Sequence, residues 1–246
     1  MFDVAEIPTP SAAFFDVDKT VIAKAAMVAF ARPLYDAGFI NRRLLAQAAY
    51  NNLRFRGFRG PDAKRMAELR EMGLRTIKGW NASEVRDIVK RTLPERIEPA
   101  IFPAALTAIR CHQRDGQDVY LVSAEPEEIV APLAEHIGVY HVICSQATVG
   151  ADGCYTGESR SWIYGPAKAT AIREAARRHN IDLQGSFAYS DSATDEPMLA
   201  TVGHPVAVNP DRALERIAAA RGWEVQRFCL ERKRSALSDR RLAWSR

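Results

Sequence analysis

The sequence lacks any long apolar run. No stretch approaches the roughly 18 consecutive apolar residues that a membrane-spanning helix needs, and the opening MFDVAEIPTP lacks the basic-then-apolar order of a secretory signal. The 246 residues are 47% hydrophobic and 26% charged, an ordinary globular composition. These features favour a cytoplasmic protein built as one large domain, or as a core with an inserted module.

Cysteine and histidine are scarce and scattered. No two cysteines form a CxxC pair, and none of the five histidines lies in a recognisable metal-ligand pattern. We therefore expect reduced, mostly packed thiols rather than disulfides or a zinc site. The cysteines are Cys111, Cys144, Cys154 and Cys229.

A basic body is also missing, although the net charge is +4. The last 16 residues, 231–246, hold six Lys/Arg against two acids, so the other 230 residues carry 28 charges of each sign. A nucleic-acid-binding protein usually has a basic face on its folded body. We therefore expect no nucleic-acid partner, and we interpret residues 231–246 as a basic tail that is solvated or disordered.

One basic stretch does lie inside the body, at residues 41–65. It has seven Lys/Arg and one acid, and its NLRFRGFRG segment interleaves arginine with phenylalanine. Two interpretations are open. The stretch is either an exposed loop and helix face, or a surface that attracts an anionic substrate or the anionic head groups of a membrane.

Short apolar runs alternate with helical patterns along the chain, which predicts an α/β fold with a Rossmann-like parallel sheet. Proline just inside an expected helix start, as at Pro103 and Pro166, fits the preference of the first helical position. A hairpin is predicted with its turn at Asp152-Gly153. The expected strands are 12–17, 118–124, 186–191, 205–209 and 224–228.

Residues 23–100 show helical spacing throughout, with a capping-box pattern at Asn81 and Glu84. The segment is too long for a simple crossover between strands. We therefore expect an all-helical cap inserted into the α/β core. The predicted division is a core of residues 1–22 and 101–230, a cap of residues 23–100, and the tail.

Polar residues follow the apolar strands where each strand ends. Ligands bind at the carboxyl ends of strands in open α/β sheets, so these side chains should converge. Burying unpaired carboxylates is costly, and a divalent cation is the most plausible group to neutralise them. An all-oxygen site with few carboxylates suits Mg²⁺. The converging residues are Asp16, Asp18, Thr20, Ser123, Lys168, Asp191 and Asp195.

This set of residues is suited to phosphoryl transfer. With its charge offset by the cation and Lys168, a phosphate could be attacked by Asp16 to give an aspartyl-phosphate. Asp18, two residues on, projects to the same side. It could protonate the leaving oxygen and later activate water. Ser123 could bind a phosphate oxygen, although SAEPEEIV also fits a helix N-cap at this serine.

Four motifs appear in order, namely DVDKT, SA after an apolar strand, GPAK and YSDSATDEPML. In these the chain resembles the haloacid dehalogenase-like hydrolases, in the arrangement found in phosphoserine phosphatases, whose helical cap lies between the first two motifs. The resemblance covers about two thirds of the chain, and the cap matches only in position and helical character.

The resemblance implies a role for each motif residue. Asp16 would be the phosphorylated nucleophile and a Mg²⁺ ligand, and Asp18 the acid/base whose backbone carbonyl also binds Mg²⁺. An acid at position 18 favours hydrolysis over storage of the phosphoenzyme. Ser123 and Lys168 would hold the phosphate. Asp191 would be a further Mg²⁺ ligand, and Asp195 would support it. Thr20 would help to shape the nucleophile loop.

Substrate specificity is less well marked. Phosphoserine phosphatases usually carry a glutamate in the early cap, but residues 21–35 contain no acid and offer Lys24 instead. Arg65 or Arg70 could meet a substrate carboxylate. Glu125 stands where the family often has glycine, and could narrow or charge the pocket. Phosphoserine is thus one candidate among several, and a substrate with a further anionic group is another.

We therefore predict a Mg²⁺-dependent phosphomonoester hydrolase that acts on a small molecule through an aspartyl-phosphate. The alternatives left open are a phosphatase of a lipid-derived phosphomonoester, a phosphotransferase, and a non-catalytic anion-binding module. Contact with a membrane surface through residues 41–65 or the tail could coexist with catalysis. The sequence predicts no oligomeric state.

Overall fold

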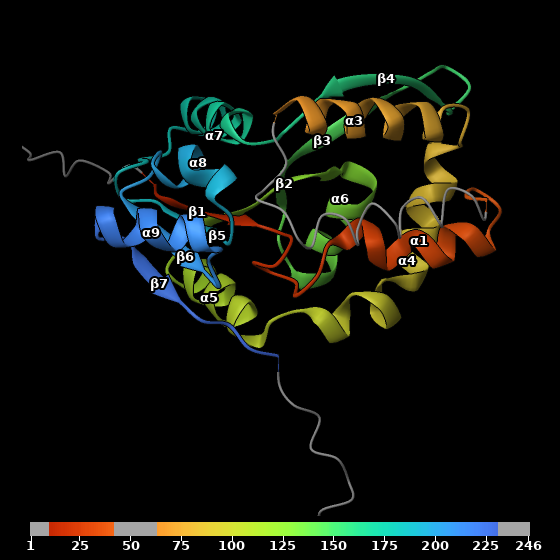
Figure 1. The fold of residues 1–246 in the computed structure, drawn as a ribbon. Coiled ribbons are helices and arrows are strands. Elements are labelled where there is room, and N and C mark those ends of the chain that lie inside the picture. Colours follow the sequence, from red (N-terminus) through yellow and green to blue (C-terminus); the bar gives the residue numbers. More distant parts are fainter. Residues whose placement is uncertain (1–9, 42–62, 231–246) are drawn as a thin grey trace, which may run out of the picture.

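The computed structural model describes residues 10–41 and 63–230. Its centre is a seven-stranded sheet flanked by helices (Figure 1), in the order β4-β3-β2-β1-β5-β6-β7. All neighbouring strands are parallel except β3 and β4, which are antiparallel. The predicted α/β fold is therefore confirmed. The strands are β1 Ala12–Asp16, β2 Asp118–Pro126, β3 His141–Val149, β4 Tyr155–Ser161, β5 Phe187–Ser190, β6 His204–Val208 and β7 Glu224–Gln226.

Strand β1 lies in the middle of the sheet, and all five of its residues are buried. It pairs with β2 on one side and β5 on the other. Because successive side chains point to opposite faces, Phe15 packs into one core cluster and Phe14 into another. Burial on both faces explains why this strand reads as a continuous apolar run rather than an alternating one.

Helices cover both faces of the sheet (Figure 1). Residues of α5 and α6 join the core cluster of Phe15, which continues into the helices of the insert. Residues of α7, α8 and α9 form the cluster of Phe14. The core helices are α5 Pro103–Arg114, α6 Glu127–Ile137, α7 Pro166–His179, α8 Glu196–Leu199 and α9 Arg212–Arg221, with the short 3-10 helix η2 at Ala193–Asp195.

The described parts of the insert between β1 and β2 are helical. Helix α4 begins after Asn81, whose side chain accepts hydrogen bonds from the amides of Ser83 and Glu84, as the capping pattern predicted. Helix α4 packs against both α1 and α6, which joins the insert to the core. The elements are α1 Ala26–Asp36, α3 Ala63–Ile77, α4 Ala82–Arg96 and the 3-10 helix η1 Glu98–Ala100.

The predicted hairpin is found between β3 and β4, with Gly153 at φ +76° in its turn. The structure adds two features that we did not expect. Strand β3 also pairs with β2 and so belongs to the main sheet. The hairpin also binds the α3–α4 connection through its main chain, since the Gly79 amide donates to Tyr155 O at 2.8 Å and the Tyr155 amide to Trp80 O at 2.9 Å.

Some predictions lie partly or wholly outside the described residues. These predictions concern most of the basic stretch 41–65 and the whole tail 231–246. Both interpretations of the basic stretch therefore stay predictions. All four cysteines lie in the described part of the chain and are unpaired. None of the helices in the described ranges has the length and apolar content to cross a membrane.

Candidate active site

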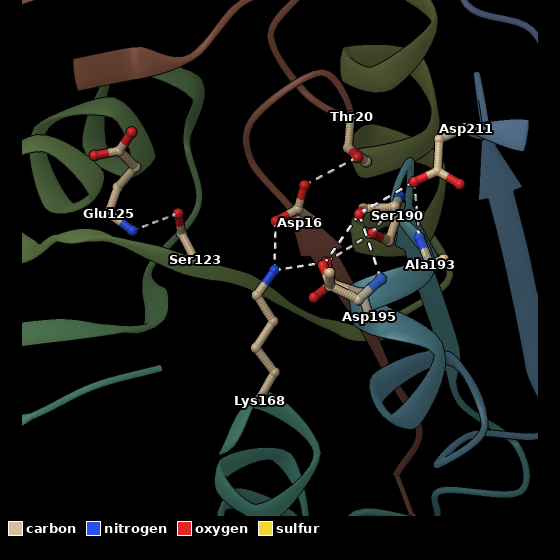
Figure 2. Close-up of polar contacts among 11 residues, drawn as sticks. Asp16, Thr20, Ser123, Glu125, Lys168, Ser190, Ala193, Asp195 and Asp211 are labelled. Atoms are coloured by element: carbon tan, nitrogen blue, oxygen red, sulfur yellow. Dashed lines mark hydrogen bonds and ion pairs between the residues drawn. The ribbon is translucent and has the colours of Figure 1, made fainter. Parts of the chain in front are cut away.

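Lys168 lies at the centre of the candidate site (Figure 2). It reaches from the first turn of α7 to Asp16 at the end of β1 and to Asp195 in η2. Its Nζ donates to Asp16 Oδ1 at 2.6 Å and to Asp195 Oδ2 at 2.7 Å. The three residues are between 3% and 6% exposed. The predicted convergence of Asp16, Lys168 and Asp195 is thus observed.

The local sequence explains how Lys168 reaches this position. Gly165 precedes α7 with φ +55°, a conformation that favours glycine, and Pro166 starts the helix. A lysine in the first turn faces the positive end of the helix dipole, which is unfavourable by itself. Burial would lower the pKa of Lys168, but the two carboxylates outweigh burial and raise it above its ordinary value.

Asp16 has both carboxylate oxygens engaged. Oδ1 accepts from Lys168, and Oδ2 accepts from Thr20 Oγ1 at 3.1 Å. Burial raises the pKa of Asp16 to about 7, even though the Lys168 ammonium lowers it. Thr20 comes close because the loop folds back on itself, with the Val17 carbonyl accepting from the amides of Val21 and Ile22. Thr20 therefore holds the orientation of the Asp16 carboxylate.

The side chain of Asp18, in the same loop, points toward the insert. Its Oδ1 accepts from the amide of Ala26, the first residue of α1, at 2.9 Å. Burial raises the pKa of Asp18 to about 8, and the neighbouring Glu125 adds to the rise. The two carboxyl groups accept from adjacent amides of α1, those of Ala26 and Met27, and so lie side by side. Asp18 thus lies between the core and the start of α1.

Ser123 is buried near the end of β2, at 2% exposure. Its Oγ accepts from the Glu125 amide at 3.1 Å (Figure 2). The N-cap interpretation of this serine is wrong, because β2 continues to Pro126 and α6 begins only at Glu127. The Ser123 hydroxyl donates to no acceptor in the described part of the chain, so its hydrogen can point from the strand end toward a bound oxygen.

Two residues that the sequence analysis missed support the Asp195 side of the site. Ser190, at the end of β5, donates through Oγ to Asp195 Oδ2 at 2.7 Å. Asp211 accepts from the Ala193 amide at 3.2 Å and also caps α9. Its own amide donates to the Asp191 carbonyl at 2.8 Å. Ser190 lies inside the motif YSDSATDEPML, but the role of Asp211 depends on a contact distant in sequence.

The donor set can be tested for a metal ion. No group of three or more His, Cys, Asp or Glu side chains suited to a metal is found among the described residues. The Asp191 carboxylate accepts no hydrogen bond from any residue the structure describes, although it is only 9% exposed. Burial raises its pKa to about 8, with a further rise from the Asp16 carboxylate.

These observations fit Mg²⁺ better than a metal that needs many protein ligands. Magnesium typically takes one or two carboxylates and completes its shell with water and substrate phosphate. Three carboxylates, those of Asp16, Asp191 and Asp195, outnumber the buried Lys168 and the exposed Lys19, whose charge also acts on Asp191. A divalent cation would balance the negative charge that is left. Asp16 and Asp191 could hold such an ion, and the family resemblance implies the main-chain carbonyl of Asp18 as a further ligand.

The candidate specificity residues are not all brought to the site. Lys24 is exposed in the turn before α1. The side chain of Arg65 is outside the described part of the structure. Arg70 lies on α3 with its guanidinium carbon 5.7 Å from the centre of the Trp162 ring, and its Nε is buried without a hydrogen-bond partner among the described residues. Among the candidates whose side chains the structure describes, Glu125 is the one with a hydrogen bond to a motif residue, since its amide donates to Ser123 Oγ.

Comparison with known proteins shows the family. The haloacid dehalogenase-like hydrolase family matches residues 13–200, which is more than half of the chain. The chain therefore belongs to the haloacid dehalogenase-like hydrolases.

Three relatives show where in the family the chain lies. It is 46% identical over 218 residues to the "inhibition of morphological differentiation protein" of Streptomyces azureus, covering 89% of this chain and 78% of that one. A probable phosphatase of Mycobacterium tuberculosis is 43% identical, with coverage of 89% and 75%. A phosphoserine phosphatase of the same organism is 33% identical over 228 residues, with coverage of 92% and 74%.

Solved structures agree on the fold. A Bordetella pertussis protein of unknown function superimposes with a TM-score of 0.76 at 26% identity, covering 89% of this chain and 98% of that one. A phosphoserine phosphatase in apo form gives a TM-score of 0.61 at 19% identity, with coverage of 90% and 95%. These matches show the fold, and in sequence the chain is similar to proteins named as phosphatases.

Proposed function

We propose that the protein is a Mg²⁺-dependent phosphomonoesterase that forms an aspartyl-phosphate on Asp16. The observation that carries the proposal is the buried group of Asp16, Lys168 and Asp195, with nitrogen–oxygen distances of 2.6 and 2.7 Å. A single ammonium that lies between two carboxylates is suited to binding a substrate with its own negative charge. A metal ion would offset the negative charge of the carboxylates.

In the first half-reaction, a carboxylate oxygen of Asp16 attacks phosphorus. A bond forms between that oxygen and phosphorus while the bond from phosphorus to the ester oxygen breaks. Asp18 donates a proton to the leaving oxygen, so that an alcohol departs rather than an alkoxide. Lys168 and the Ser123 hydroxyl bind the phosphate oxygens and stabilise the charge that develops there.

In the second half-reaction, water attacks the phosphorus of the aspartyl-phosphate. Asp18, now ionised, accepts the proton of that water, and the Asp16–phosphorus bond breaks. Inorganic phosphate leaves, and Asp16 and Asp18 return to their starting forms. When bound by Asp16, Asp191 and the Asp18 carbonyl, Mg²⁺ supplies positive charge that lets an anionic nucleophile approach an anionic phosphate.

We also propose the division of the chain that the sequence predicts. Residues 1–22 and 101–230 form the catalytic core, and residues 23–100 form a cap that restricts the entry of water and substrate. The contacts of α4 with α6 and the main-chain bonds between Gly79–Trp80 and Tyr155 support a cap that stays docked on that side. The protein would act in the cytoplasm on a small phosphomonoester.

The substrate remains a choice among phosphorylated alcohols. The relative named phosphoserine phosphatase supports phosphoserine as the first to test. The first turn of α1 contains no acid, so the cap lacks the early glutamate that would meet a substrate ammonium in the phosphoserine enzymes. We therefore expect measurable but modest turnover of phosphoserine, and a better substrate among other small phosphomonoesters.

The test is phosphate release from p-nitrophenyl phosphate and from phosphoserine, with Mg²⁺ and with EDTA. Asp16→Asn should abolish release in both cases, because the amide is a poor nucleophile. Asp115→Asn is the matched control, since Asp115 is exposed at the end of α5, and it should retain full activity. Metal-independent release, or full activity in Asp16→Asn, would refute the proposal.

A further inference from the structure

The first turn of α1 has no cap of its own. Ala25 occupies the N-cap position with an extended backbone, makes no side-chain hydrogen bond, and is followed by no acid in the first turn. The first amides of a helix have no partner within it and need an external acceptor. The start of α1, which borders the loop of Asp16 and Asp18, therefore depends on acceptors from other elements.

Two carboxyl groups from the core provide these acceptors. Asp18 Oδ1 accepts from the Ala26 amide at 2.9 Å, and Glu125 Oε1 accepts from the Met27 amide at 3.2 Å. Asp18 follows β1 and Glu125 lies near the end of β2, so the start of α1 is held from two neighbouring strands. The residues Asp18 and Glu125 are 107 positions apart in the chain, and only the folded sheet brings them together.

Glu125 also contacts the catalytic residues directly. Its carboxyl group accepts from the Met27 amide while that of Asp18 accepts from the adjacent Ala26 amide, so the two carboxyl groups lie side by side, and the Glu125 amide donates to Ser123 Oγ at 3.1 Å. Glu125 therefore lies beside the acid/base Asp18, donates to Ser123 and accepts from the insert at once. A side chain in that position limits where the Asp18 carboxyl can point.

We propose that Glu125 is a positioning residue that holds the Asp18 carboxyl next to the start of α1. The packing of α1 against the core then also sets the orientation of the Asp18 acid. This inference rests on the proposed phosphatase function. It assigns to Glu125 a role in proton delivery to the leaving group. The sequence had instead suggested a role in substrate specificity, because Glu125 follows the phosphate-binding Ser123.

The role predicts an effect that depends on the leaving group. An alkoxide needs a proton from Asp18 as it departs, whereas nitrophenolate leaves without one. The parameter to compare is kcat/KM, which reports the first half-reaction and not the later hydrolysis of the phosphoenzyme. Because a well-placed general acid contributes about 10²–10⁴-fold, misplacing it should cost about tenfold or more with an alkyl phosphate.

The experiment measures kcat/KM of wild type and Glu125→Ala with phosphoserine and p-nitrophenyl phosphate. We expect the alkyl-to-aryl ratio to fall about tenfold in the variant. Glu127→Ala is the control for loss of a nearby acid, since Glu127 starts α6 and accepts from Gln146 Nε2 at 2.8 Å; it should keep the wild-type ratio. An unchanged ratio in Glu125→Ala would overturn the proposal.

A double variant separates aiming of the acid from simple helix capping. In Ala25→Ser/Glu125→Ala, the serine supplies a local cap from a backbone already extended as a cap requires. It should recover thermal stability lost in Glu125→Ala without restoring the alkyl-to-aryl ratio. Restoration of the ratio by the serine would mean that Glu125 acts only as a helix cap.

Hydrogen exchange provides a readout that does not need turnover. Amides at the start of α1 should exchange faster in Glu125→Ala than in wild type or Glu127→Ala, and equal exchange would contradict the proposed contact. If wild type releases no phosphate from either substrate, the proposed function fails, while this measurement still decides whether Glu125 holds α1.

Discussion

Replacing Lys168 with methionine isolates the electrostatics of the buried site. Lys168 is 3% exposed and donates to Asp16 and Asp195 at 2.6 and 2.7 Å. Methionine fills similar space but has no charge, so two carboxylates would lose their only cation among the described residues. Removing one partner of a buried ion pair typically costs about 3–5 kcal/mol, because the remaining charge stays desolvated. We expect a loss in this range at pH 8 without metal.

The pH dependence gives the prediction its sign. Burial raises the pKa of Asp16 to about 7 while Lys168 is present, and loss of the ammonium must raise it further. A carboxyl whose folded-state pKa exceeds its unfolded value gives stability at low pH that is lost as pH rises through the folded pKa. The cost of Lys168→Met should therefore be smallest near pH 6. Above pH 7 it should grow by about 1.4 kcal/mol per pH unit until the new pKa is reached.

The assay is urea denaturation from pH 6 to pH 8.5 in EDTA, since a bound cation would replace the missing charge. Lys90→Met is the matched control. The Lys90 Nζ lies 2.7 Å from Glu135 Oε2, nearly the distance found at Lys168, but both side chains are largely exposed. Water screens such a pair, so the control should change little at any pH. A cost for Lys168→Met that is independent of pH, or no larger than that of the control, would refute this electrostatic reasoning.

Three further predictions test other features. Lys19 has φ +59°, so Lys19→Gly should raise the free energy of unfolding by about 1 kcal/mol, as judged by chemical denaturation; a loss of stability would show that the lysine side chain offsets the strain. Gly203→Ala would place a Cβ 1.9 Å from the main-chain oxygen of Gln184, and it should lower stability by about 3 kcal/mol or prevent folding, whereas a melting temperature equal to wild type would contradict that geometry. Because burial raises the pKa of Asp16 to about 7 and that of Asp191 to about 8, Mg²⁺ must displace protons at low pH, and its affinity measured by calorimetry should be at least about tenfold weaker at pH 6 than at pH 8; equal affinity at both pH values would exclude these two carboxylates as its ligands.

The strand ends show how far the sequence alone could go. Apolar runs that stop at polar residues mark the carboxyl ends of parallel strands, and Asp16, Ser123 and Asp191 could be placed near one another on that basis. The prediction succeeded because β1, β2 and β5 are adjacent in the sheet. The N-cap interpretation of Ser123 was wrong, because the acids suited to a helix start follow a strand that continues to Pro126.

The hairpin shows a second limit. The turn at Asp152-Gly153 could be predicted from its residues, because a glycine with positive φ is a local requirement. The pairing of β3 with β2 and the bonds from the hairpin to the α3–α4 connection could not be predicted in this way. Main-chain hydrogen bonds place almost no requirement on the side chains of the residues that make them, so such contacts are visible only in the folded chain.

The sequence by itself determined the α/β order of the elements, the helical character of the described parts of the segment between β1 and β2, and the residue types at the strand ends, because periodicity, capping and residue type act over a few positions. The tertiary structure decided which groups meet. It placed Lys168 between Asp16, 152 positions away, and Asp195, recruited Asp211 to the support of η2, and set Glu125 against Asp18 at the uncapped start of α1. Contacts of this kind follow from the order and register of the strands, which no local pattern encodes.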